Sequence, residues 1–221
     1  MFKSNPPYNI IEQQGGQCIE VIHPLIQHKL TLLRDKATTV PEFRRTLGEL
    51  AGLLAFEVTR QLGTAPTTVE TPLETTNGVK MARPVLLVPI LRAGLGLLNP
   101  MLQVIPDAHV GFLGLKRDET TLAPISYYEN IPKDLSTLDV IVLDPMLATG
   151  GSLVAALTTL AKLNPATLQV MTLLAAPEGI STVLKAHPTV TVYTASVDRE
   201  LNKRGYILPG LGDAGDRIFN S

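Results

Sequence analysis

The chain has 221 residues, of which 45% are hydrophobic and 18% charged, so it can bury one sizeable core and does not have the composition of a disordered chain. Nineteen basic and twenty acidic residues leave a formal net charge of -1, which disfavours a general nucleic-acid binder. The single cysteine, Cys18, excludes an intrachain disulfide, and no apolar stretch has membrane-spanning length. We therefore expect a single cytoplasmic domain over residues 1–221, with no membrane or nucleic-acid partner.

The first third of the chain predicts an N-terminal arm followed by two helices. Residues 1–22 read as a loose arm that ends in a short strand near 18–22, and a helix opens at His23-Pro24. A second helix begins at residues 41–42 and carries an apolar stripe at helical spacing, Leu47, Leu50, Leu54 and Val58. Beyond it a strand is predicted near 67–71, and Asn77-Gly78 indicates a hairpin turn or loop within 74–83.

From residue 85 onward, apolar strands alternate with helices. Strands are predicted at 85–90, 108–115, 140–143, 168–174 and 190–194, and helices at 151–163 and about 178–186. This alternation predicts an α/β fold in which helices flank a parallel sheet. The Tyr- and Pro-rich segment 120–132 is expected to form a flexible arm, and residues 196–221 a small C-terminal lobe.

One strand-to-helix junction has the composition of a phosphate cradle. It follows the apolar run 140–143 and consists of Asp144, Pro145, Met146, Leu147, Ala148, Thr149, Gly150, Gly151 and Ser152. Glycines let the backbone approach a ligand, and the following helix supplies free N–H groups and a favourable dipole. The spacing fits neither a Walker A loop nor a dinucleotide fingerprint, and an acid directly before the cradle suits ribose hydroxyls or a cation. The loop therefore favours a sugar phosphate, although an ordinary glycine-containing turn is an equal alternative.

Two arginines follow predicted strands at the same edge of the sheet. Arg92 comes directly after the strand at 85–90, and Arg117 follows the strand at 108–115. A guanidinium in such a place can form a bidentate contact with phosphate oxygens, and two of them suit a pyrophosphate. The alternative is that each arginine is only a solvated surface charge. This alternative is stronger for Arg117, because Arg117 lies in the charged run 116–119.

The stretch from Gly205 to Asp216 contains four glycines, a proline and two aspartates in twelve residues. The exposed backbone N–H and C=O groups of such a loop can form hydrogen bonds with the edge of a flat heterocycle. The alternative is a flexible tail, but Tyr206, Ile207 and Phe219 favour a lobe that docks on the core.

Taken together, these stretches resemble uracil phosphoribosyltransferases. The resemblance rests on residues 88–94, 144–152, 175–180, 193–196 and 205–216, and it runs from about His23 to the C-terminus. It implies the type I phosphoribosyltransferase fold, with a flexible arm and a C-terminal hood over the base. It also implies transfer of the phosphoribosyl group of 5-phosphoribosyl 1-diphosphate (PRPP) to uracil, which gives UMP and pyrophosphate in pyrimidine salvage.

The resemblance assigns roles to residues of this chain. Asp144–Ser152 would bind PRPP, with Asp144 near the ribose hydroxyls, and Arg92 and Arg117 would contact the pyrophosphate. Ile207, Gly212, Asp213 and Ala214 would bind uracil, and Asp213 would also lie near PRPP as a candidate catalytic residue with Arg92 and Arg117. Many members use Mg²⁺ and some are activated by GTP. Because Pro145 stands where the wider motif has a second acid, we expect Mg²⁺ to arrive mainly on the pyrophosphate.

Other readings remain open at this point. The chain could serve another base, such as a purine, or it could be an RNA-binding protein that senses UMP on this fold, against which the near-neutral charge weighs. An inactive homologue is a third alternative. The Leu-rich helices before residue 63 and the segment 120–132 also suggest a homodimer or higher homo-oligomer.

Overall fold

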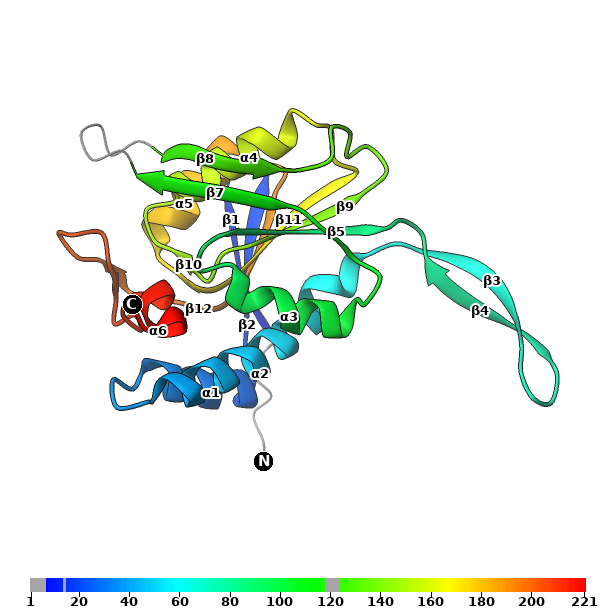
Figure 1. Ribbon diagram of the computed structural model, residues 1–221, viewed down its shortest axis with the longest axis horizontal. Coiled ribbons are helices and arrows are strands. Elements are labelled where there is room, and N and C mark those ends of the chain that lie inside the picture. The colour runs from blue at the N-terminus through cyan, green and yellow to red at the C-terminus, as the bar shows by residue number, and fades with distance from the viewer. Residues whose placement is uncertain (1–6, 14, 118–123) are drawn as a thin grey trace.

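The computed structural model describes residues 7–13, 15–117 and 124–221. The strands of its central sheet are β1 (Tyr8–Gln13), β2 (Gly16–Val21), β5 (Val85–Leu91), β6 (His109–Val110), β7 (Phe112–Arg117), β8 (Pro124–Asn130), β9 (Asp139–Leu143), β10 (Met146–Leu147), β11 (Thr167–Ala175) and β12 (Thr191–Val197). They lie in the order β1-β2-β12-β11-β9-β5-β7-β8, with β10 paired to β11 and β6 to β5 (Figure 1).

The predicted parallel sheet is confirmed. From β2 through β12, β11, β9 and β5 to β7, every neighbouring pair is parallel. Antiparallel pairs close both edges, β1 with β2 and β7 with β8. Parallel neighbours place the carboxyl ends of β5, β7 and β9 along one edge, which positions the candidate site.

Helices cover both faces of the sheet, as Figure 1 shows. They are α1 (Pro24–Arg34), α2 (Val40–Val58), α3 (Leu95–Val104), α4 (Gly151–Ala161), α5 (Pro177–Ala186) and α6 (Ala214–Phe219), with a short 3-10 turn at Thr59–Gln61. One hydrophobic cluster joins the sheet to α1, α2, α3 and α6, and another joins it to α4 and α5. Within the described residues, no helix combines the length and apolar character needed to cross a bilayer.

Alternation along the strands explains how one sheet supports two cores. In β5, Val85 and Leu87 belong to the first cluster, whereas Leu86 and Val88 belong to the second. A strand buried on both faces needs such a continuous apolar run. The predicted stripe of α2 is likewise confirmed, because all four of its residues are at most 2% exposed, Leu47, Leu50, Leu54 and Val58.

The N-terminal segment differs from the expected loose arm. β1 and β2 pair in antiparallel orientation, and β2 extends the main sheet beside β12. Gly15 has φ +93°, a backbone conformation that a tight hairpin turn requires and that glycine tolerates without strain. The Gly15-Gly16 pair was therefore the sequence signal for this hairpin. Residues 1–6 lie outside the described part of the chain.

A second hairpin is formed by β3 (Thr64–Glu70) and β4 (Thr75–Met81), which Figure 1 shows projecting from the body of the molecule. The predicted turn at Asn77-Gly78 is wrong, because both residues lie inside β4, opposite Thr68 and Thr67. The turn lies at 71–74 instead, where the Thr71 hydroxyl donates to the Glu74 carbonyl at 2.7 Å and accepts the Glu74 N–H at 3.0 Å. A local side-chain bond thus outweighed the Asn-Gly preference.

Two further segments relate to the candidate site. The predicted arm at 120–132 includes β8, an edge strand paired with β7, while residues 120–123 lie outside the described ranges. The C-terminal lobe, residues 196–221, contains the small sheet of β13 (Glu200–Leu201) with β14 (Ile207–Leu208), followed by α6. We call this lobe the hood.

Candidate active site

The strand ends that carry the predicted site residues lie side by side. Leu143 at the end of β9 is paired with Pro89 of β5, and Ile90 of β5 is paired with Leu113 of β7. Arg92 and Asp144 each follow the last residue of a strand, and Arg117 is the last residue of β7. The backbone of all three therefore lies at the same edge. The Arg117 side chain lies outside what the structure describes.

The turn after β5 packs directly on the end of β9. The Gly94 N–H donates to the Ile90 carbonyl at 2.9 Å, and a Cβ at Gly94 would lie only 2.3 Å from the Leu143 carbonyl oxygen. Only glycine fits this approach, which brings the Arg92 turn close to Asp144. Arg92 is solvent-exposed, and its guanidinium carbon lies 6.0 Å from the ring centroid of Phe219 in the hood. The peptide bond between Leu91 and Arg92 is cis.

The predicted phosphate cradle ends at the N-terminus of a helix. After Asp144 and Pro145, the two residues of β10 pair with β11, and α4 starts at Gly151. Gly150 is the N-cap with φ +85°, so the N-cap residue has no side chain to cap the helix, and the first turn carries no acidic residue. The first N–H groups of α4 and its dipole are therefore suited to an anion such as a phosphate.

Asp144 is the first residue of this loop, and its carboxyl group is poorly hydrated. Burial raises the pKa of its carboxyl to about 6, although a hydrogen bond from the Met146 N–H to Oδ1, at 3.3 Å, acts in the opposite direction. Part of the side-chain surface remains accessible. A carboxylate short of water gains from any hydroxyl that donates to it, so Asp144 is suited to two neighbouring sugar hydroxyls.

The hood faces the cradle across a cavity of about 350 Å³. Its lining includes Ala93, Met146 and Ala148 from the strand-end loops and residues 204–207 and 212–215 from the hood. All four predicted base-binding residues are among them, Ile207, Gly212, Asp213 and Ala214. Asp213 is the N-cap of α6, and its Oδ1 accepts the Asp216 N–H at 3.0 Å. The structure thus brings the two predicted halves of the site together.

Five residues of this cavity were absent from the predicted site, and two of them, Arg204 and Tyr206, carry long polar side chains. Arg204 and Tyr206 flank Gly205, and both line the cavity. Gly205 has φ +78°, and a Cβ placed on it would lie 3.5 Å from Cγ2 of Thr149, so this turn touches the cradle. In the sequence, the signal for this turn was Gly205, which has a cationic residue, Arg204, before it and an aromatic residue, Tyr206, after it.

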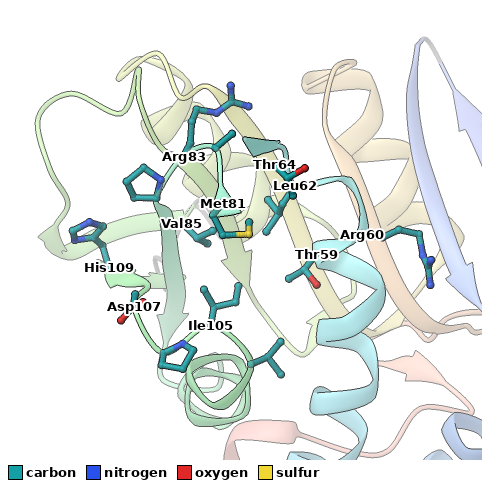
Figure 2. A pocket seen from close by; sticks show the side chains of 14 residues that line it. Thr59, Arg60, Leu62, Thr64, Met81, Arg83, Val85, Ile105, Asp107 and His109 are labelled. Carbon is teal, nitrogen blue, oxygen red and sulfur yellow. The ribbon is translucent and has the colours of Figure 1, made fainter. Parts of the chain in front are cut away.

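A larger hollow of about 760 Å³ lies elsewhere, near the amino end of β5 and the base of the β3–β4 hairpin. Figure 2 shows Leu62, Met81 and Val85 gathered in its middle, while the guanidinium groups of Arg60 and Arg83 point toward different sides. None of the predicted site residues lines it. Since ligands of open α/β sheets bind at the carboxyl ends of the strands, we assign the candidate site to the smaller cavity.

The described residues contain no group of three or more His, Cys, Asp or Glu side chains arranged to hold a metal ion. At the strand end Asp144 is followed by Pro145, so this turn offers one carboxylate. A hard cation such as Mg²⁺ prefers several oxygen ligands and retains water and substrate phosphates among them. These side chains therefore fit a metal that arrives with a phosphorylated substrate rather than one held by the protein alone.

Comparison with solved structures identifies the fold. The structure resembles a hypoxanthine-guanine phosphoribosyltransferase from Bacillus anthracis with a TM-score of 0.50 and 16% sequence identity, over 72% of this chain and 80% of that one. The AQ2163 protein from Aquifex aeolicus matches with a TM-score of 0.87 and 40% identity, over 91% of this chain and 97% of that one. The fold is that of the type I phosphoribosyltransferases.

Within that class the sequence places the chain in one family. The family model described as uracil phosphoribosyltransferase matches residues 20–221. The uracil phosphoribosyltransferase of Delftia acidovorans is 54% identical over 200 residues, which cover 90% of this chain and 96% of the relative. That of Halalkalibacterium halodurans is 52% identical over the same shares. The chain belongs to the uracil phosphoribosyltransferase family.

Proposed function

We infer that this chain is an enzyme that transfers the 5-phosphoribosyl group of PRPP to uracil and releases UMP and pyrophosphate, a reaction of pyrimidine salvage. One observation carries this inference beyond family membership. The cavity of about 350 Å³ is lined on one side by the loop after β9, which suits a sugar phosphate, and on the other by exposed backbone of the hood, which suits a base. A nucleotide-forming enzyme needs these two half-sites to face each other.

We propose that PRPP binds along the strand-end loops. The N-terminus of α4, with residues 148–152, would hold the 5-phosphate, and Asp144 would accept hydrogen bonds from the ribose hydroxyls. Arg92 and Arg117 would neutralise the pyrophosphate as it leaves. Mg²⁺, which phosphoribosyltransferases generally use with PRPP, would enter as part of the substrate and add positive charge at the same place.

We propose that the hood reads uracil through backbone groups of Ile207 and residues 212–214. Uracil presents two carbonyls that flank an N–H, which match two donors and one acceptor. Cytosine places an amino group where uracil has an acceptor, so two donors would face each other and buried groups would be left unpaired. We therefore expect a marked preference for uracil, and comparable turnover of cytosine would contradict this reading.

The chemistry requires little from the protein beyond positioning and charge. Loss of pyrophosphate builds positive charge on the ribose ring, and the uracil nitrogen attacks from the opposite face, which converts the α linkage to β. No covalent nucleophile takes part. Water has to be excluded, or PRPP is hydrolysed, and we propose that the hood and the segment 120–132 serve this purpose.

Two roles remain open for Asp213, which could take the N–H proton of uracil or only orient the base. Asp213→Asn keeps an oxygen that can accept the Asp216 N–H, so the helix cap should survive. If Asp213 acts as the base, the variant loses about a hundredfold or more in kcat and the acidic limb of the pH profile disappears. If Asp213 only orients uracil, the KM for uracil rises and the pH profile keeps its shape.

We further propose that the protein is a homodimer or higher homo-oligomer. Within the described part of the chain, the β3–β4 hairpin forms a separate two-stranded sheet, and it exposes large apolar side chains, Val69, Leu73, Val79 and Met81. Light scattering coupled to size-exclusion chromatography tests this proposal. Activation by GTP and a cytoplasmic location stay predictions, the first resting on the family resemblance and the second on a single, buried free cysteine, Cys18.

The inferred reaction is tested by incubating the purified protein with PRPP, Mg²⁺ and uracil and following UMP by chromatography. We expect UMP and pyrophosphate in equal amounts. A protein that instead served a purine would give product only with that base. An inactive protein that shifts RNA in a gel at moderate salt would favour the RNA-binding alternative.

A further inference from the structure

An ion pair that the predicted site does not include joins α1 to the hood. Arg34 is the last residue of α1, and Asp198 follows β12. The guanidinium forms a fork on the carboxylate, with hydrogen bonds of 2.7 Å to Oδ2 and 2.5 Å to Oδ1. The Asp198 side chain is only 2% exposed and that of Arg34 23%. The Ser196 hydroxyl also donates to Asp198 Oδ1, at 3.2 Å.

Both members of this pair hold the backbone of Gly210. The Gly210 N–H donates to Asp198 Oδ2 at 2.9 Å, and Arg34 donates to the Gly210 carbonyl at 2.8 Å. Gly210 has φ +64°, and a Cβ there would lie 2.3 Å from the Ile207 carbonyl oxygen, so the turn is tight. Gly210 therefore connects the two predicted base-binding segments, Ile207 before it and residues 212–214 after it.

The Arg34–Asp198 pair is better suited to positioning the backbone than to stabilising the fold. Burial alone would raise the pKa of Asp198, but hydrogen bonds from Arg34 and from the Gly210 N–H, together with the charge of Arg34, hold it below its usual value. The carboxylate therefore stays charged near neutral pH. A buried ion pair contributes little net stability compared with apolar residues of similar size, whereas its geometry is well defined. Here the ion pair defines the position of the backbone turn at Gly210.

We propose that Arg34 and Asp198 are positioning residues that fix the backbone of the hood against the core, and thereby set the KM for uracil and the preference for uracil over cytosine. This proposal rests on the proposed function. The geometry places the pair at the junction of α1 with the hood, because its contacts there are with Gly210 and Ser196. The phosphate cradle is formed by other elements, so the KM for PRPP should depend on the pair much less.

Steady-state kinetics with each substrate varied in turn tests the proposal. The variants are Arg34→Lys, which keeps the charge but loses the fork, and Asp198→Asn, which keeps the shape but loses the charge. The chain offers a matched control in Arg83 and Asp139, where Arg83 also binds a buried aspartate, at 3.1 Å through Nε and 3.0 Å through a terminal nitrogen. Asp139 is 1% exposed and starts β9, at the opposite edge of the sheet.

We expect Arg34→Lys and Asp198→Asn to raise the KM for uracil on the order of tenfold, with the KM for PRPP changed less than about twofold. The uracil-to-cytosine ratio of kcat/KM should fall. Arg83→Lys and Asp139→Asn should lower the melting temperature without changing either KM. The proposal is overturned if the folded Arg34 and Asp198 variants keep the wild-type KM for uracil, or if both KM values rise equally in all four variants.

Failure of the proposed function would look different, because the unaltered protein would then make no UMP at all. A measurement on the unaltered protein covers the case in which the variants do not fold. The Gly210 amide should exchange its hydrogen slowly, since it is buried and bonded to Asp198. Exchange at the rate of a free peptide would overturn the proposal.

Discussion

Replacing Asp144 by Asn should stabilise the protein and impair its activity at the same time. Burial raises the pKa of this carboxyl from 3.8 to about 6, which means that the folded state disfavours its charge. At pH 8 a shift of this size means that the ionised carboxylate lowers the free energy of unfolding by at most about 3 kcal/mol. Because the residue is partly exposed, we expect Asp144→Asn to raise the free energy of unfolding by about 1–3 kcal/mol. Asn keeps an oxygen for the Met146 N–H, so the loop should retain its conformation.

The pH dependence follows from the direction of the shift. Because the folded pKa lies above the unfolded one, the ionised carboxylate destabilises the folded protein fully above about pH 6. This penalty fades as the pH falls from about 6 through 3.8, and it is gone well below 3.8, where the carboxyl is protonated in both states. The advantage of Asp144→Asn should therefore be largest at pH 8 and fall to about half near pH 5.

Thermal unfolding at pH 8 and pH 5 measures the effect. For a chain of this size, the expected gain is an increase in melting temperature of about 3–9 °C at pH 8. The kcat/KM for PRPP should fall about tenfold or more, because an amide accepts hydrogen bonds from ribose hydroxyls less strongly than a carboxylate. A variant no more stable than wild type at pH 8, or one whose advantage grows at pH 5, would refute the reasoning.

Three further substitutions probe the backbone and the charge of the site. Gly150→Ala should cost about 1–2 kcal/mol in unfolding experiments and raise the KM for PRPP, because φ +85° disfavours any side chain and a Cβ would lie 3.0 Å from the Gly179 carbonyl oxygen. Gly52→Ala should stabilise the protein by about 0.5–1 kcal/mol in the same experiment, since Gly52 lies inside α2 and a Cβ there meets nothing within 4 Å. Arg92→Gln should lower the kcat/KM for PRPP about a hundredfold with little change in melting temperature, because Arg92 is exposed.

Each of these has a clear contrary result. Equal stability changes in Gly150→Ala and Gly52→Ala would mean that the left-handed conformation at the cradle carries no cost. If Arg92→Gln keeps the wild-type kcat/KM, the Arg92 guanidinium does not help to neutralise the leaving pyrophosphate. A loss of folding in that variant would show that Arg92 is structural, as its 6.0 Å contact with Phe219 allows.

The parts of the fold that local sequence determines were predictable. The strand of 85–90 is buried on both faces, so it has to be apolar throughout, and this makes it visible as an uninterrupted run. The stripe of α2 is visible because a helix repeats its buried face at a fixed spacing. The junction between β9 and α4 was predictable for a similar reason, since glycines and an acid between a strand and a helix are contiguous in the chain, while its role as a phosphate cradle stays a prediction.

Features that depend on distant contacts were not predictable. Arg34 and Asp198 are separated by 164 positions, and neither stands in a recognisable motif. The β1–β2 pair has a local signal in Gly15-Gly16, but its place in the sheet depends on the pairing of residues 17–20 with 191–194, which no local pattern reveals. The turn of the β3–β4 hairpin was misplaced because Thr71 competes with Asn77-Gly78 through a side-chain bond of its own. In the first two cases the deciding interaction joins residues whose proximity only the fold creates, whereas at Thr71 two local signals competed.

We infer that the cavity between the cradle and the hood is where phosphoribose is joined to uracil. The most direct test gives the protein PRPP, Mg²⁺ and an equimolar mixture of uracil, cytosine, hypoxanthine and adenine, and separates the nucleotide products by chromatography. The account predicts UMP with little or no product from the other three bases. A purine nucleotide as the main product, or no nucleotide while PRPP remains intact, would contradict it.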